Sequence, residues 1–321
     1  MAPASKKVLV LGGTGVIGKI LLDTLLAAKD EFERIGLFTS PETYAKKAGL
    51  INVFKSRGAE VLVGDLDNDN DVRTAYEGFD TVVSALGRTA IEKQCNLISL
   101  AERSPSIVRF IPSEFGTDIA FNASSAEEKP HQAKLKVRAF LHSDAVRRLA
   151  FTFLVTGPFA DLYVGSMAHE PRLGSFDIKT RHAVLLGDGD GKIALTTMAD
   201  CGRALLGLLQ HPEACDAKAI IVHSFVTTPH TILREFERQM NATWSVEYTS
   251  LADLRLLEDQ AWAQSNPLAA LYTLRRIWTQ GATLYPQVDN ETIGLAKTDT
   301  LEMVVQAAIV KPASGFQSGD L

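Results

Sequence analysis

Residues 8–19 read Val-Leu-Val-Leu-Gly-Gly-Thr-Gly-Val-Ile-Gly-Lys, an apolar run that leads into closely spaced glycines. The apolar run predicts a buried parallel strand, and the residues from Val16 onward predict a helix with one apolar face. Gly12 permits a tight turn, Gly15 lets backbone amides approach a pyrophosphate, and Gly18 lets the helix pack closely on the strand. The free amides and positive dipole end at the start of this helix favour phosphate groups. This order of strand, turn and helix predicts a dinucleotide-binding site.

Composition narrows the class of protein. The chain has 321 residues and a formal net charge of -5, which gives no electrostatic reason to expect nucleic acid or an anionic membrane as a partner. No secretory segment precedes Val8, and the apolar runs are too short to span a bilayer. Cys95, Cys201 and Cys215 lack metal-ligand spacing, so we expect no metal site. These features are typical of a cytoplasmic enzyme that acts on a small molecule.

The first half of the chain alternates strand and helix patterns, which is typical of an α/β, doubly wound parallel sheet. After the first strand we expect strands at residues 34–39, 59–65, 80–87, 108–113 and 151–156. A further apolar run at 183–186 meets the acidic, glycine-rich segment 187–191. We expect a turn there, because Lys192 and Ile193 occupy places where a calcium loop needs an acidic ligand and a glycine.

This pattern predicts two structural parts. We expect residues 1–157, completed by 183–223, to form a Rossmann-type NADP-binding domain. Residues 158–182 and 224–321 should form a smaller, mainly helical substrate-binding lobe over the carboxyl edge of the sheet, where ligands bind in such folds.

Cofactor choice should be visible at the end of the second strand, where an acidic side chain would bind the ribose of NAD. Thr39 and Ser40 stand there instead, followed by Lys46 and Lys47. Hydroxyl and ammonium groups suit a 2′-phosphate better than a pair of ribose hydroxyls, so NADP(H) is favoured. If the two lysines only solvate a surface helix, the preference stays open.

The catalytic base is not the usual short-chain tyrosine, because no tyrosine in this chain has a lysine four residues downstream. Beyond the fifth strand lie the loop 112–118 and a helical pattern at 129–141, with Pro130 suited to its first turn. His131 and Lys134 are three residues apart and therefore share one face of that helix. A lysine desolvated beside a nicotinamide has a lowered pKa and is able to do acid–base work on a substrate oxygen. The alternative is a solvated helix lysine.

Several of these segments resemble one family. The glycine segment 12–19, Gly64-Asp65-Leu66, residues 109–116, the helix of Lys134 and residues 186–189 together resemble the isoflavone reductase-like group. This is the NmrA-like branch of atypical short-chain dehydrogenases, which includes phenylcoumaran benzylic ether and pinoresinol–lariciresinol reductases. The resemblance covers most of residues 6–240. The amino-acid sequence around Lys134 and at residues 156–161 is more similar to that of fungal members than to that of plant members.

The resemblance implies NADPH as hydride donor and a catalytic lysine, which falls on Lys134. The plant reductases have an arginine where this chain has Thr39. Gln94, Phe115 and Phe159 match places near the nicotinamide or substrate, whereas Ser113 and Glu114 are expected to shape the loop. The resulting cofactor site comprises Gly12, Thr14, Gly15, Val16, Ile17, Gly18, Thr39, Ser40, Lys46, Ser84, Leu86, Gly87, Gln94, Ser113, Phe115, Lys134 and Phe159.

We therefore expect an NADPH-dependent reductase of a small, apolar, aromatic secondary metabolite. Lys134 is the expected catalytic group. His131 is a second candidate, either for substrate binding or proton relay or as a structural residue. The far wall of the pocket needs aromatic side chains from outside the Rossmann core, and at least two of Phe159, Tyr163, Trp262, Tyr272, Trp278 and Tyr285 should contact the ligand. The expected substrate site comprises Phe115, His131, Phe159, Tyr163, Trp262, Tyr272 and Trp278.

Two other functions remain open: a non-catalytic NADP-sensing regulator, and an enzyme of this fold that catalyses a non-redox cyclisation or isomerisation. The oligomeric state is also open, with a homodimer as one option.

Overall fold

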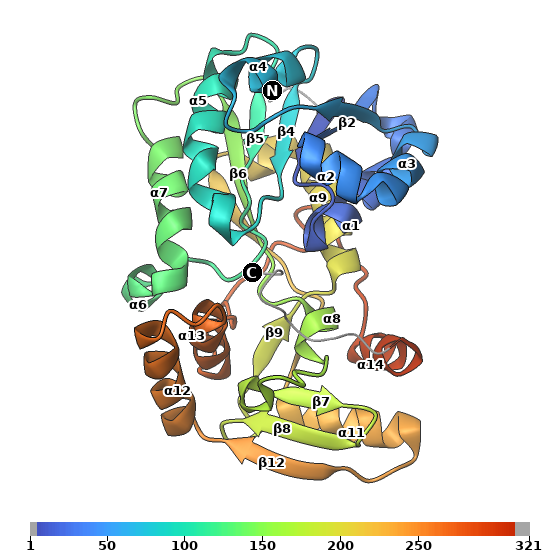
Figure 1. Cartoon of the computed structure of the whole chain (residues 1–321), viewed down its shortest axis with the longest axis vertical. Coiled ribbons are helices and arrows are strands. Elements are labelled where there is room, and N and C mark those ends of the chain that lie inside the picture. The colour runs from blue at the N-terminus through green and yellow to red at the C-terminus, as the bar shows by residue number, and fades with distance from the viewer. Residues whose placement is uncertain (1–4, 312–321) are drawn as a thin grey trace.

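A seven-stranded parallel sheet forms the centre of the protein. The computed structural model describes residues 5–311, and Figure 1 shows this sheet above a smaller lobe. Its strands are β1 (Lys7–Leu11), β2 (Arg34–Thr39), β3 (Glu60–Val63), β4 (Thr81–Ser84), β5 (Arg109–Ile111), β6 (Ala150–Val155) and β10 (Lys218–Ile221). Their spatial order is β10-β6-β5-β4-β1-β2-β3, and all neighbouring pairs are parallel. The doubly wound α/β fold predicted from the sequence is confirmed.

Helices cover both faces of this sheet. One face carries α1 (Val16–Ala27), α2 (Pro41–Lys46), α3 (Ala48–Ser56) and α9 (Met198–Gln210), and the other carries α4 (Asp69–Tyr76), α5 (Gln94–Arg103) and α7 (Gln132–Leu141). Side chains along β1 alternate between the two cores, because successive strand residues point to opposite faces. Val8 and Val10 join the first core, while Leu9 and Leu11 join the second. The sheet is therefore buried on both sides.

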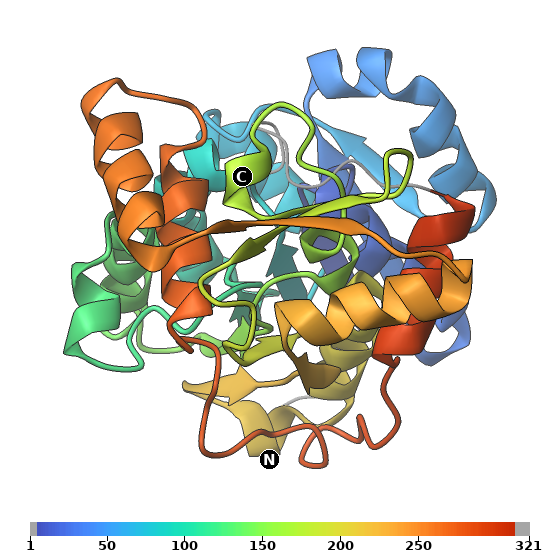
Figure 2. The ribbon, with the colours of Figure 1, turned by 90° about the horizontal axis from the view of Figure 1, so that it is seen from below.

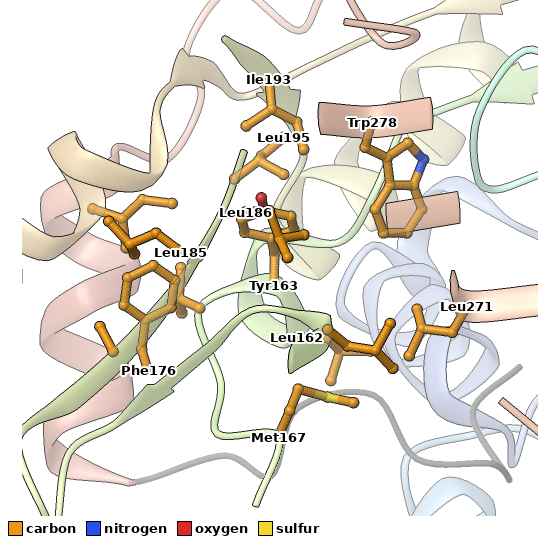
Figure 3. Packing of buried hydrophobic residues seen from close by; sticks show 14 of the residues in the cluster. Leu162, Tyr163, Met167, Phe176, Leu185, Leu186, Ile193, Leu195, Leu271 and Trp278 are labelled. Atoms are coloured by element: carbon orange, nitrogen blue, oxygen red, sulfur yellow. The ribbon is translucent and has the colours of Figure 1, made fainter. Parts of the chain in front are cut away.

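The smaller lobe contains two short sheets and four longer helices (Figures 1 and 2). One sheet has the order β12-β8-β7, and the other pairs β11 with β9. The elements are β7 (Ser175–Asp177), β8 (His182–Leu186), β9 (Ile193–Leu195), β11 (Phe225–Thr227), β12 (Ser245–Thr249), α11 (Pro229–Met240), α12 (Leu251–Ala263), α13 (Ala269–Thr279) and α14 (Leu301–Val310). Figure 3 shows their shared core, in which side chains such as Leu185, Leu195 and Leu271 are buried.

Short elements connect these parts. They are η1 (Lys29–Glu31), η2 (Arg88–Lys93), α6 (Ala123–Glu127), η3 (Lys129–His131), α8 (Ala160–Tyr163), η4 (Pro171–Leu173) and α10 (Pro212–Cys215). The glycine-rich segment after β8 is a turn, as expected. No helix within residues 5–311 combines the length and the apolar character needed to cross a membrane.

The structure corrects one expectation about the sheet. We expected residues 183–223 to complete the Rossmann domain, but β8 pairs with β7 and β12 in the lobe. From this segment β10 joins the large sheet, and α9 and α10 pack against it. The lobe is also less helical than expected, because β8 forms a sheet in it with β7 and with β12, which comes much later in the chain.

Candidate functional site

The turn after β1 requires glycine at two places. Gly12 has a φ of +75°, and a Cβ there would lie 2.6 Å from the carbonyl oxygen of Ala85. A Cβ on Gly18 would collide with the carbonyl oxygen of Gly12, so helix α1 packs directly on the turn. Gly15 N donates to Gly12 O over 2.9 Å, which closes the turn. The backbone thus forms the narrow cradle that the glycine spacing predicted.

The start of α1 is free of side-chain caps. Gly15 is its N-cap residue, and no side chain accepts a hydrogen bond from the first turn. The first turn also contains no acidic side chain. The amides of Val16 and Ile17 are therefore available to an anion, and the helix dipole adds to the attraction.

This helix start opens into a cavity of about 200 Å³ at the carboxyl edge of the large sheet. The cavity combines residues that follow four strands of the sheet with residues of η3, α7 and α13. Its lining consists of Gly15, Val16, Ile17, Ala85, Leu86, Gly87, Arg88, Ile91, Ser113, Glu114, Phe115, Gly116, Thr117, Ile119, Pro130, His131, Ala133, Lys134, Gly157, Pro158, Phe159, Leu274 and Trp278.

Lys134 is a half-buried residue in the wall of this cavity, and its Nζ donates a hydrogen bond to the carbonyl oxygen of Glu114. Burial is the main cause that lowers the pKa of Lys134 from 10.5 to about 8; the carboxylate of Glu114 opposes this lowering, and the nearby Arg88 and Arg138 contribute to it. An amine with this pKa exchanges protons near neutral pH. Lys134 is therefore chemically suited to acid–base work within the cavity.

His131 lies in the same wall, one helical turn before Lys134. It is only 3% exposed, and its Nδ1 lies 2.6 Å from the carbonyl oxygen of Ser125. A carbonyl only accepts, so Nδ1 carries the proton and Nε2 is an acceptor. Burial lowers the pKa of His131, which keeps the ring neutral. Nε2 is buried and has no hydrogen-bond partner among the described residues.

Glu114 lines the cavity, but its carboxylate is held by another residue. Arg138 binds both of its oxygens, at 3.0 and 3.1 Å, and also binds Asp118 at 2.8 Å. The Glu114 side chain is 2% exposed. This ion pair shapes the loop that carries the carbonyl partner of Lys134, in line with the structural role expected for Glu114.

Gln94 and Ser113, two residues expected near the cofactor, hold the loop after β5 in place. Gln94 uses both ends of its amide on backbone groups: Oε1 accepts from Ser113 N at 2.8 Å, and Nε2 donates to Ile91 O at 3.1 Å. Ser113 Oγ donates to Leu86 O at 2.9 Å. Gln94 and the buried Ser84 do not line the cavity. Gln94 therefore supports the loop from behind the cavity, whereas Ser84 is a buried strand residue whose Oγ has no hydrogen-bond partner among the described residues.

At the end of β2 the structure separates the two lysines. Lys46 points to solvent and pairs with Glu42 at 2.6 Å. Lys47 instead donates to the carbonyl oxygen of Thr14, over 2.8 Å, and so reaches the glycine turn. Ser40 caps α2 by accepting from Thr43 N, and Thr39 is buried beside it. We expected Lys46 in the cofactor site, but in the structure the next residue, Lys47, reaches the glycine turn.

Aromatic side chains form part of the cavity wall. Phe115, Phe159 and Trp278 line it, and the indole Nε1 of Trp278 donates to Thr117 Oγ1 at 2.7 Å. Figure 3 shows Trp278 at the edge of the lobe core, in which Tyr163 is also buried.

Tyr163, Trp262 and Tyr272 do not line the cavity, which corrects their expected place in the substrate site. Tyr163 lies under the guanidinium of Arg275, and Trp262 donates to Thr273 Oγ1. Tyr285, the sixth candidate, is also absent from the lining, because its hydroxyl accepts from Asp118 N. These rings pack inside the lobe or against the loop that follows β5, and so they do not face the cavity.

Sequence reasoning missed one charged residue of the cavity, Arg88 at the start of η2. A single arginine after a glycine looks like an ordinary surface residue, and only the folded chain brings it against Pro130. Among residues 5–311, no cluster of His, Cys, Asp or Glu side chains has the arrangement of a metal site.

Comparison with known proteins places this geometry in a family. The model of the NmrA-like family matches residues 4–284. The chain belongs to the NmrA-like family. Within it, the isoflavone reductase homologue A622 of Nicotiana glauca is 32% identical over 218 residues, which cover 66% of this chain and 67% of that protein. The resemblance to the isoflavone reductase-like group is thereby confirmed.

Solved structures share the fold of this NmrA-like protein at low sequence identity. Leucoanthocyanidin reductase of Vitis vinifera, solved with NADPH, superposes with a TM-score of 0.79 at 19% identity, covering 95% of this chain and 100% of that chain. AtPrR2, solved with NADP+ and (+)pinoresinol, gives a TM-score of 0.77 at 21% identity, covering 95% and 99%.

Proposed function

We propose that this protein is an NADPH-dependent reductase of a small, flat, largely apolar aromatic metabolite, with Lys134 as its acid–base group. One observation carries the proposal. The uncapped start of α1 and the desolvated amine of Lys134 open into the same cavity. The first feature suits a dinucleotide phosphate, and the second suits proton transfer at a substrate oxygen.

The residues present fit a bound dinucleotide. A Cβ at Gly12 would fill the space beside Ala85, and the glycine leaves this cradle open. The amides of Val16 and Ile17 would hold the pyrophosphate, and Lys47 would add positive charge beside the turn. NADPH, when bound, supplies a hydride to an electron-poor carbon such as that of a conjugated alkene, quinone methide or carbonyl. Both solved neighbours described above carry this type of cofactor.

The chain's own side chains then handle the substrate. The ammonium form of Lys134 donates a proton to the substrate oxygen, and the neutral amine keeps its hydrogen bond to Glu114 O until solvent reprotonates it. His131 Nε2 accepts a hydrogen bond from a substrate hydroxyl and orients it. Phe159 and Trp278 offer flat apolar faces that exclude water and favour aromatic rings. The (+)pinoresinol bound to the neighbour AtPrR2 is in keeping with such a substrate class.

The test uses NADPH deuterated at C4 and a panel of conjugated aromatic carbonyl compounds and quinone methide precursors. The proposal expects NADPH to be consumed and deuterium to appear on a carbon of the product, as measured by mass spectrometry. A product formed without deuterium and without NADPH consumption would establish non-redox chemistry instead. Tight NADPH binding with no product from any compound would favour a cofactor-sensing regulator.

A further inference from the structure

Arg88 is an arginine in the cavity wall whose hydrogen-bonding capacity is largely unused. It begins η2, and the loop residues 85–87 separate it from the end of β4. Its Nη1 donates to the carbonyl oxygen of Pro130 over 3.2 Å, and its Nε is buried without a partner among the described residues. No carboxylate within residues 5–311 forms an ion pair with it. A guanidinium offers five N–H donors, so most of them are left for a ligand.

The surroundings of Arg88 are basic. Lys134 and His131 line the same cavity, and the charge of Arg88 lowers the pKa of both, although burial is the larger cause in each case. Glu114 is the acidic residue of the lining, and its two carboxylate oxygens are already bound by Arg138. The cavity therefore has positive charge that the described residues do not balance.

Arg88 is half-buried, with its Nε fully buried, and this makes an unpaired charge costly in the absence of a ligand. Desolvation lowers the pKa of Arg88. A buried charge normally has a partner of opposite sign, and a planar guanidinium matches a carboxylate with two parallel hydrogen bonds. An anionic group of the ligand would supply the missing partner.

The anchor of Arg88 indicates which ligand this group meets. The pyrophosphate of a dinucleotide belongs at the start of α1, whereas Arg88 is held by Pro130, next to His131 in the segment that leads to Lys134. Apolar residues of the lining, including Phe115, Phe159 and Trp278, complete the cavity. A fitting ligand has an aromatic body and one acidic group.

Building on the proposed function, we propose that Arg88 binds a carboxylate of the substrate, so that the enzyme selects aromatic carboxylic acids over neutral analogues. The carboxylate accepts hydrogen bonds from the guanidinium, while the aromatic part reaches toward Lys134. Arg88 is then a specificity-determining residue of the cavity.

The experiment compares cinnamate with cinnamamide, which have nearly the same shape and differ in charge. Each is titrated into the protein by calorimetry, with and without saturating NADP+. Wild-type protein should bind the acid at least about tenfold more tightly than the amide, as expected for a charge-assisted hydrogen bond. Arg88→Gln should remove this preference, and Arg88→Lys should keep part of it.

Lys129→Gln provides the matched control. Like Arg88→Gln, it removes one positive charge, here from η3. Lys129, however, lies over the ring of Trp262 at 4.9 Å and does not line the cavity. This variant should keep the preference for the acid. NADP+ affinity should stay within a few-fold in all variants.

Equal binding of acid and amide by the wild-type protein would overturn the proposal, even if Arg88→Gln failed to fold. It would also be overturned if Arg88→Gln kept the preference for the acid but lost NADP+ affinity, since Arg88 would then serve the cofactor phosphates. These titrations need no turnover. A missing hydride transfer would therefore refute the reductase function while leaving the carboxylate result readable.

Discussion

The indole Nε1 of Trp278 donates a 2.7 Å hydrogen bond to Thr117 Oγ1, and this bond ties helix α13 of the lobe to the loop that follows β5. The same loop carries the carbonyl partner of Lys134 and the carboxylate held by Arg138. Both residues of the bond are buried and line the cavity. The lobe therefore supports the reactive wall of the cavity as well as covering it.

We expect this bond to be measurable in a double-mutant cycle. Trp278→Phe keeps a flat ring and Thr117→Val keeps the volume, while each removes the bond. The free energies of unfolding of the two single variants and the double variant, from urea titrations, should give a coupling of about 0.5–1.5 kcal/mol. Additive effects would show that the two residues do not interact in solution.

The ion pair between Glu114 and Arg138 should matter more for stability than a surface pair. Removing one partner of a buried pair leaves an uncompensated charge, so Arg138→Met should lower the free energy of unfolding by about 3–5 kcal/mol. Arg147→Met is the control, because its partner Asp144 is exposed and such pairs contribute about 0–1 kcal/mol. Equal losses in urea unfolding would contradict the buried role of Arg138.

Cofactor preference should depend on Lys47. We expect NADPH to bind at least about tenfold more tightly than NADH, because a charge-assisted phosphate contact contributes about 1.5–3 kcal/mol. Lys47→Ala should reduce this ratio, since its Nζ reaches Thr14 at the glycine turn. Lys46→Ala should leave the ratio unchanged, because Lys46 pairs with Glu42 in solvent. Calorimetry that gave equal affinities for the two cofactors would refute the NADP preference.

The rate of reduction should fall as the pH rises past the pKa of Lys134. Burial lowers this pKa to about 8, so the ammonium form that donates a proton is present below that pH and is lost above it. The turnover number for reduction should therefore decrease above pH about 8, and the reverse oxidation should show the opposite slope. A turnover number for reduction that rises through this range would mean that the neutral amine is the active form.

Much of the fold follows from local sequence patterns. The apolar runs that end in glycine or small polar residues predicted six strands of the large sheet, because continuous apolar runs of this length are typical of parallel strands. The edge strand β10 was missed, since Lys218–Ile221 is short and lies between polar segments. The run at β8 was recognised as apolar but placed in the wrong sheet. Its parallel partner β12 lies far along the chain, and no local pattern encodes that pairing.

The residues of the candidate site also fall into two groups, those that the sequence predicts and those that only the folded chain reveals. Gly12 and Gly18 were recognisable because their backbone geometry excludes other residues. Lys134 was recognisable from its helix and from the family resemblance. Arg88 was not, because its importance depends on its burial against Pro130, which only tertiary structure creates. The late aromatic residues were equally ambiguous, since a ring in a helix serves a core or a pocket with the same local sequence.

If Lys134 acts on the substrate while other residues hold the cofactor, its loss slows hydride transfer without weakening NADPH binding, and single-turnover kinetics separate these two effects. Enzyme preloaded with NADPH is mixed with a substrate from the panel, and hydride transfer is followed by the loss of NADPH fluorescence. Lys134→Ala should lower the rate by about 10²–10⁴-fold while NADPH affinity stays within a few-fold. Lys136 is the control, because it is an exposed lysine of the same helix that pairs with Glu92. The Lys136→Ala variant should react at the wild-type rate. An unchanged rate in Lys134→Ala would show that Lys134 takes no part in the reaction.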